Sequence, residues 1–148
     1  MYKRQDYQEA ARLYRLAADQ GEAGAQCSLG YMYDKGQGVA QDYREAARLY
    51  RLAADQGHAD AQFYLGYMYS NGQGVAQNYQ EAARLYRLAA DQGHTRSQYN
   101  LGHLYHTGRG VAQDYQEAAR LYRLTADQGF APAQSNLGSM YYLSLIHI

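Results

Sequence analysis

A unit of 36 residues is repeated along this chain of 148 residues, and this repetition limits the fold more than any other feature. The string EAARLYRLAADQG starts at Glu9, Glu45 and Glu81, and it returns at Glu117 with threonine in place of one alanine. The chain also has 18 tyrosines and no tryptophan, as expected when one short unit is copied. Periods of about 20–50 residues are typical of solenoids and similar arrays. The sequence therefore predicts one elongated array of about four repeats.

Each repeat contains two segments with helical signals. The repeated string follows a residue that can cap a helix N-terminus, and these residues are Asp6, Asp42, Asn78 and Asp114. This first helix ends before a glycine, found at Gly21, Gly57, Gly93 and Gly129. A second helix is predicted over residues 23–33, before the Gly-x-Gly-Val turn that starts at Gly36. Two antiparallel helices per repeat predict an all-α fold, an α/α superhelical solenoid of helix pairs.

Arg15 and Asp19 lie one turn apart on the first helix, where side chains of opposite charge are neighbours. We therefore expect these two side chains to form an ion pair on the surface. Such a pair contributes only about 0.3 kcal/mol to helix stability.

The second helix has a constant face and a variable face. On a helical wheel, Ala25, Met32 and Tyr33 lie within about 60° of Leu29, and these positions hardly change between copies. The opposite face varies freely and is rich in aromatic, histidine and asparagine side chains. We expect it to bind a partner, and its candidate residues are Tyr31, Phe63, Tyr64, Tyr67, Tyr99, Asn100, His103 and His106. The alternative is a solvated face that varies freely, although solvent exposure favours charged residues over aromatic ones.

The repeat resembles the Sel-1-like repeat, a tetratricopeptide-like family. One copy of the matching pattern reads Ala61, Leu65, Gly66, Tyr69, Gly72, Gly74, Val75, Tyr79, Ala82, Tyr86, Ala89, Ala90 and Gly93. The pattern covers nearly everything from Asp6 to Tyr141. The resemblance implies a right-handed superhelix of helix pairs. It also implies a scaffold or adaptor role in protein–protein interaction, mostly in bacteria.

The same resemblance implies structural roles for the leucine, tyrosine and glycines of each second helix and turn. These residues are Leu29, Gly30, Tyr33, Gly36, Gly38, Leu65, Gly66, Tyr69, Gly72, Gly74, Leu101, Gly102, Tyr105, Gly108 and Gly110. A glycine inside a helix costs about 1 kcal/mol relative to alanine, so a packing reason is expected. We expect the glycine after each leucine, including Gly138, to let neighbouring helices approach closely.

Charge and hydropathy argue against several classes of function. The 14 basic and 14 acidic residues cancel, whereas nucleic-acid binding needs a basic surplus. No apolar stretch approaches the roughly 20 residues of a membrane-spanning helix. The sequence does not open like a signal peptide, and the localisation stays open. Cys27 is the only cysteine, so the β-lactam binding reported for disulfide-rich, secreted members of the family does not carry over.

No motif predicts a catalytic, metal or cofactor site. Gly36-x-Gly38 lacks the lysine and the preceding strand of a phosphate-binding loop. His103 and His106 lie one turn apart, but no fixed third ligand accompanies them. Cys27 has no evident neighbouring base, and we interpret it as a residue of the variable face. A small-molecule or peptidoglycan-fragment hydrolase therefore has almost no support.

Both ends depart from the repeat. We assign residues 1–142 to the array, with partial repeats at both ends because Met1 falls inside the expected turn. Residues 143–148 replace Gly-x-Gly-Val and resemble the translation of a transposon-based sequencing adapter, so we interpret them as a library artefact. The alternative is a genuine apolar tail that seals the last helix. We expect the chain to be a fragment of a longer array.

These observations predict a non-enzymatic scaffold that binds a protein or peptide on its stacked helices, without a cofactor. Neither nucleic-acid binding nor membrane insertion is expected. The alternative is a regulatory or targeting repeat segment of a larger enzyme or cell-envelope protein.

Overall fold

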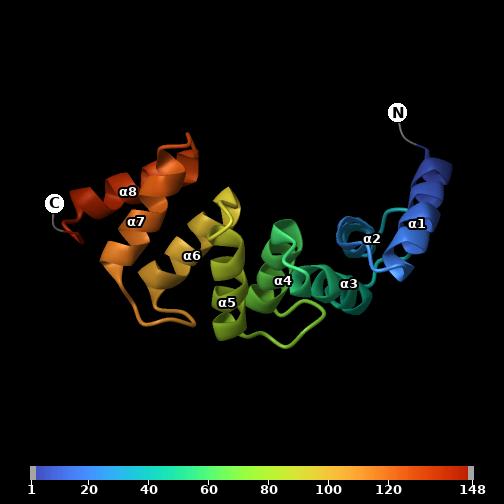
Figure 1. Cartoon of the computed structure of the whole chain (residues 1–148). Coiled ribbons are helices and arrows are strands. Elements are labelled where there is room, and N and C mark those ends of the chain that lie inside the picture. The colour runs from blue at the N-terminus through green and yellow to red at the C-terminus, as the bar shows by residue number, and fades with distance from the viewer. Residues whose placement is uncertain (1–2, 147–148) are drawn as a thin grey trace. The chain divides into compact units, whose positions relative to one another are not determined.

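The computed structural model describes residues 3–146, which form eight α-helices and no β-strand (Figure 1). The chain divides into two compact units, Met1–Gln77 and Asn78–Ile148. The first unit contains α1 (Arg4–Asp19), α2 (Ala23–Lys35), α3 (Tyr43–Asp55) and α4 (Ala59–Asn71). The second contains α5 (Tyr79–Ala90), α6 (Thr95–Thr107), α7 (Tyr115–Ala126) and α8 (Ala131–Tyr142). Odd-numbered helices are the first helices of the repeat and even-numbered helices are the second, which confirms the predicted all-α solenoid of helix pairs.

Three of the four predicted N-terminal caps are confirmed. The side chain of Asp42 accepts hydrogen bonds from the first turn of α3, and Asn78 and Asp114 do so for α5 and α7. The prediction for Asp6 is wrong, because α1 already begins at Arg4. Lys3 is the N-cap residue of α1, and Asp6 is the third helical residue, from which an acidic side chain can reach back to the N-cap backbone. Asp6 instead accepts a hydrogen bond from the Lys3 N–H at 3.2 Å.

The first helices end at a glycine, as predicted. The N–H of Gly21 donates to the carbonyl of Ala18, and the N–H of Glu22 donates to the carbonyl of Ala17. These two bonds form a Schellman motif, which satisfies carbonyl groups that the end of a helix would leave unpaired.

The two glycines of the Gly-x-Gly-Val turn have different structural roles. Gly36 closes α2 in the left-handed conformation at φ 69°, and its N–H donates to the carbonyl of Met32. Gly38 has φ 72° and lies against α1, where an added Cβ atom would collide with the carbonyl oxygen of Tyr7. Backbone conformation requires glycine at the first position, and the close approach of the helix requires it at the second.

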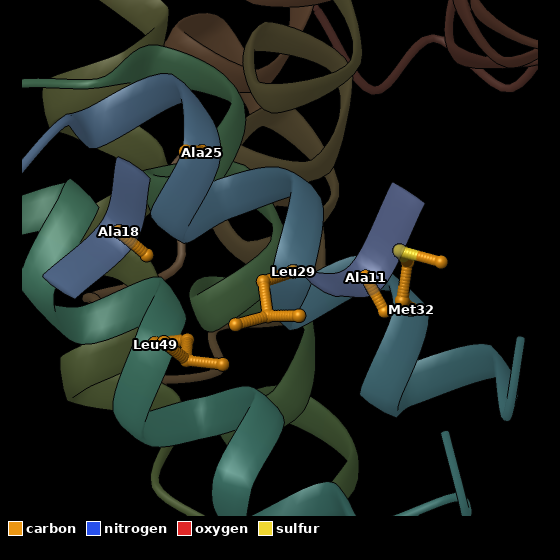
Figure 2. Packing of buried hydrophobic residues seen from close by; sticks show 6 residues of the cluster. All are labelled: Ala11, Ala18, Ala25, Leu29, Met32 and Leu49. Carbon is orange, nitrogen blue, oxygen red and sulfur yellow. The ribbon is translucent and has the colours of Figure 1, made fainter. Parts of the chain in front are cut away.

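The predicted constant face of α2 forms the core of the first unit. Leu29, Ala25 and Met32 are buried with residues of α1 and α3, and Figure 2 shows this cluster: Ala11, Ala18, Ala25, Leu29, Met32 and Leu49. Tyr33, the fourth predicted residue of this face, is half-buried and packs against the cluster. Alternating small and large side chains allow the three helices to pack closely.

Arg15 joins first helices of successive repeats, which differs from the prediction. Its guanidinium donates to the hydroxyl of Tyr33 and lies 3.6 Å from the carboxylate of Glu45 on α3. No ion pair with Asp19 is present among residues 3–146. The helical spacing could not show this, because both partners come from other helices. The second unit repeats the arrangement, with Arg87 3.7 Å from Glu117.

Residues after α8 follow the path of a turn without its glycines. Ser144 has φ 57° at the position that Gly36 occupies three helix pairs earlier, a strained conformation for a residue with a Cβ atom. Ile146 stands where Gly38 and Gly110 stand, and it is buried against α7 and α8. Residues 1–2 and 147–148, which belong to the predicted array start and tail, lie outside the described residues.

Candidate functional site

The variable face of the first unit exposes tyrosine. Tyr31 on α2 is 37% exposed and Tyr67 on α4 is 48% exposed, while Tyr64 is half-buried. Phe63, predicted on the same surface, is only 3% exposed and therefore belongs to the core. Cys27 occupies the same repeat position on α2 and is also buried, so its interpretation as a surface residue is wrong.

The helical wheel predicted exposure at Cys27 and Phe63, and both predictions are wrong for the same reason. A wheel with one buried face suits a helix that lies on the surface of a domain. In this fold α2 packs against both α1 and α3, which cover two sides of it. Gln26, Cys27 and Gly30 are therefore buried together with Leu29. Only a narrow strip of the second helix remains for contacts with a partner.

Aromatic rings of α2, α3 and α4 pack against one another beside this strip. The rings of Tyr31 and Tyr64 are 5.7 Å apart, and Tyr64 stacks on the buried Tyr50 of α3 at 5.2 Å. The ammonium of Lys35 lies 5.6 Å from the centre of the Tyr31 ring, within the range of a cation–π contact. The exposed tyrosine of α2 is thus held in place from two sides, which lowers the entropy cost of binding.

A groove of about 520 Å³ runs beside these rings in the first unit. Its lining includes Tyr7 and Tyr14 of α1, Ser28 and Tyr31 of α2, and Asp60 and Tyr64 of α4. Apolar walls with a few polar groups are typical of surfaces that take up a side chain or a short ligand. The wheel did not find the contribution of α1, because only the three-dimensional arrangement places a first helix at this groove.

Buried polar groups under the strip are protonated or hydrogen-bonded. Burial raises the pKa of the Cys27 thiol to about 12, and the Asp60 carboxylate adds to this effect. The thiol is therefore neutral near pH 7 and is a poor nucleophile. The hydroxyl of Tyr50 donates to Asp34 at 3.2 Å, and its pKa is raised, first by burial and then by the Asp34 charge.

The second unit covers most of its candidate residues. Tyr99 is half-buried, with its ring 5.4 Å from Tyr122 and 5.0 Å from Phe130, and its hydroxyl accepts a hydrogen bond from Asn136 at 2.9 Å. Asn100 is half-buried. These candidate residues of the second unit therefore present little surface to a partner.

The two histidines of this unit have different environments. His106 is half-buried and places its ring edge-on to Tyr115 at 5.6 Å, whereas His103 is exposed. The pKa of His103 is lowered by partial burial, and the nearby His106 and Arg109 add to this effect. Its neutral form is therefore favoured at neutral pH.

The described helices also limit other roles. Within residues 3–146, no three histidine, cysteine or acidic side chains gather closely enough to hold a metal ion. None of the helices in that range has the length and apolar character needed to cross a membrane.

Three solved structures of bacterial proteins have the same fold. A protective antigen of uropathogenic Escherichia coli with an SLR fold superposes with a TM-score of 0.87 at 39% identity, over 90% of this chain and 29% of that one. A Sel1 repeat protein from Oxalobacter formigenes gives 0.86 at 37% identity, over 93% of this chain and 55% of that one. The chain thus spans well under two thirds of either protein.

The cysteine-rich protein B of Helicobacter pylori shares the fold, with a TM-score of 0.70 over 92% of this chain and 98% of that one. Its identity of 20% supports the likeness of fold alone. A comparison with curated protein sequences found no match.

The family comparison agrees with the repeat and its turns. The family model called Sel1 repeat matches residues 2–22, 23–58, 59–94, 95–130 and 131–145, which together span nearly the whole chain. Each complete match begins with a second helix and ends after the following first helix. The chain therefore belongs to the Sel1 repeat family.

Proposed function

We propose that the chain is a non-enzymatic scaffold that binds a protein or peptide on the exposed strip of its second helices. Sel1 repeat proteins generally act as scaffolds for protein interaction. The observation that carries the proposal is the exposure of Tyr31 and Tyr67 at a position that varies between copies, with Tyr31 lining a groove of about 520 Å³. Tyrosine suits such a surface because it offers a large contact area at low conformational cost.

The structure changes which residues carry this proposal. Tyr31, Tyr64 and Tyr67 form the contact surface of the first unit, while Phe63 supports it from the core. In the second unit, His103 is the most accessible of the proposed residues, and Tyr99 and His106 contribute only their uncovered edges. The first unit is therefore the primary partner site.

A peptide selection tests the proposal. The chain is immobilised, peptides are selected from a displayed random library, and their affinities are measured for the Tyr31→Ala/Tyr67→Ala variant. Exposed aromatic residues that anchor a ligand contribute about 1–2 kcal/mol each, so we expect the affinity to fall at least tenfold.

The matched control is Leu52→Ala/Leu88→Ala. These leucines are 40% and 41% exposed, but they lie on first helices. The control should bind the selected peptides as the parent chain does. Equal affinity for the tyrosine variant and the parent chain would remove the proposed site.

The second proposal is a regulatory or targeting segment of a larger protein. It is favoured by the coverage of 29% and 55% of two similar chains, both longer than this one. Sequencing the flanks of the gene without transposon adapters tests it, and it also tests the proposed artefact at residues 143–148. A further domain joined in frame would support this second role. In-frame stop codons directly before Met1 and directly after Ile148 would rule it out.

A further inference from the structure

Tyr50 and Tyr122 are copies of one repeat position, and the preceding helix holds both in the same way. In each unit the second helix of one repeat packs on the first helix of the next, α2 on α3 and α6 on α7. A Cβ atom added to Gly30 would be 2.9 Å from the Tyr50 ring, and one added to Gly102 would be 3.0 Å from the Tyr122 ring. The predicted close approach of helices is thus confirmed at these two glycines. It is wrong at Gly138, where an added Cβ atom would meet no atom of residues 3–146 within 4 Å.

The two tyrosines differ in what their hydroxyl groups contact. Both side chains are fully buried. The hydroxyl of Tyr50 donates to the carboxylate of Asp34 at 3.2 Å. The hydroxyl of Tyr122 has no hydrogen-bond partner within residues 3–146. A buried hydroxyl without an acceptor is costly, so a group that accepts its hydrogen bond would be bound favourably.

One difference between the copies explains the missing acceptor. Asp34 and His106 occupy the same position of the repeat, at the ends of α2 and α6, and both are half-buried. The ring of His106 lies edge-on to the ring of Tyr122 at 6.2 Å. A carboxylate near the surface therefore reaches the buried hydroxyl in the first unit, whereas the second unit has an imidazole in its place.

The other neighbours of Tyr122 do not replace this acceptor. The ring of Tyr99 is 5.4 Å from the Tyr122 ring, and its hydroxyl accepts a hydrogen bond from the Asn136 amide at 2.9 Å. Burial raises the pKa of Tyr122, although the Asn136 amide acts in the opposite direction. The N–H groups of an amide donate and cannot take up the hydroxyl proton. The hydroxyl of Tyr122 therefore keeps its proton and is a donor at neutral pH.

The second helices of the second unit suit an acidic ligand. Helices α6 and α8 contain no aspartate or glutamate, whereas α2 contains Asp34 and α4 contains Asp60. The pKa of His103 is lowered, first by partial burial and then by His106 and Arg109, so these three side chains lie near one another. Histidine and arginine N–H groups donate hydrogen bonds to carboxylates. The strip of this unit thus offers donors without an acid on its own helices.

We propose that the second unit binds an acidic residue of a protein or peptide partner, whose carboxylate accepts the hydrogen bond of Tyr122 as Asp34 accepts that of Tyr50. His106 turns aside to admit this carboxylate, and Arg109 adds positive charge beside it. The proposal rests on the proposed role as a scaffold and names the chemistry of the partner that this unit takes.

Two phenylalanine variants test the unpaired hydroxyl without a ligand. Tyr122→Phe removes a buried donor that has no acceptor, so the midpoint of urea unfolding should stay the same or rise. Tyr50→Phe is the matched control, because it breaks the hydrogen bond to Asp34 and should lower the midpoint. A loss for Tyr122→Phe as large as that for Tyr50→Phe would mean that the hydroxyl already has an acceptor, and it would contradict the proposal.

The binding test uses the Tyr31→Ala/Tyr67→Ala variant, which keeps the second unit and lacks the exposed tyrosines of the first. Peptides selected on this chain from a displayed random library should be enriched in aspartate and glutamate. One such peptide is compared with a copy whose acidic residue is replaced by its amide. The replacement should weaken binding about tenfold, and it should have much less effect once Tyr122→Phe is added to the chain.

Variants of His106 sharpen the test. His106→Asp supplies within the chain the carboxylate that the first unit has, so it should weaken binding of the acidic peptide about tenfold. His106→Ala removes the covering ring without supplying a carboxylate, and it should bind the peptide at least as well as the chain with His106. Equal affinities of these two variants would overturn the proposal.

The selections separate this proposal from the proposed scaffold function. Peptides that need Tyr31 and Tyr67 of the parent chain, without acidic peptides for the double variant, would overturn the carboxylate site alone. An amide replacement that weakens binding equally with and without the Tyr122 hydroxyl would also overturn it. A library that returns no peptide from either chain would overturn both proposals.

Discussion

The first and second helices of each repeat differ in how freely their sequences vary, and burial explains part of the difference, since the constant Leu52 and Leu88 are exposed. The first helices are nearly identical copies, and the copies Tyr50 and Tyr122 are both fully buried. In the second helices, the constant Leu29 is 1% exposed, whereas the variable Tyr31 and Tyr67 are exposed. The constant positions build the scaffold, and some of the variable positions remain free for contact. Variation alone does not mark the surface, since the variable Phe63 is buried.

The largest expected effect is a difference in stability between two alanine variants, one at a tyrosine of a first helix and one at a tyrosine of a second helix. Tyr50→Ala removes a buried ring that stacks on Tyr64 and should cost about 3–5 kcal/mol of unfolding free energy. Tyr67→Ala removes an exposed ring and should change stability by no more than about 0.5 kcal/mol. Urea unfolding followed by circular dichroism measures both. Similar losses at the two positions would contradict the division between scaffold and contact surface.

A smaller effect is expected for two glycines with the same place in the repeat. Gly30→Ala brings a Cβ atom to 2.9 Å from the Tyr50 ring and should destabilise the fold by about 1–3 kcal/mol. Gly138→Ala meets no neighbour and should stabilise its helix by about 0.5–1 kcal/mol. Thermal unfolding of the two variants should therefore shift in opposite directions. Shifts of the same sign would show that contact with the tyrosine ring does not determine the need for glycine at this position.

Replacing the aspartate by alanine should reduce stability by different amounts in α1 and α3, although the sequences that follow Asp6 and Asp42 are nearly the same. Asp42→Ala removes a carboxylate that accepts the N–H groups of Arg44 and Glu45, at a cost of about 1 kcal/mol. Asp6→Ala should cost less, because Asp6 lies inside α1 rather than before it. Chemical unfolding of each variant compares the two positions. An equal loss would mean that α1 begins at Asp6 after all.

The smallest expected effect depends on pH. The hydrogen bond from Arg48, together with the charges of Arg48 and Arg15, holds the pKa of Glu45 below its ordinary value of 4.5, although partial burial opposes this shift. A lowered pKa adds stability above pH 4.5, and this stability is lost as the pH falls through the lowered value. The parent chain should therefore be more stable than Glu45→Gln near pH 7, and the difference should shrink in acid. A difference that stays constant from neutral to acidic pH would exclude this ion pair as its source.

Local structure could be predicted well from the sequence. Caps such as Asp42 and turn glycines such as Gly36 act within a few residues of chain, so their patterns are readable. The constant face around Leu29 was also predicted correctly, because burial repeats with the period of the helix.

Contacts between helices could not be predicted in the same way. A wheel for one helix cannot show that α2 packs on two first helices, so Cys27 and Phe63 were placed on the wrong side. Spacing along α1 suggested Asp19 as the partner of Arg15, whereas the arginine reaches Tyr33 and Glu45 on other helices. The part of the groove formed by Tyr7 and Tyr14 was missed for the same reason.

The central claim is that partners contact the exposed strip of the second helices. The most direct measurement is nuclear magnetic resonance of the labelled chain with a selected peptide, following the backbone amide signals during titration. We predict that the largest shifts fall on α2 and α4, around Tyr31, Tyr64 and Tyr67. Shifts concentrated on the first helices, around Leu52 and Leu88, would contradict the claim.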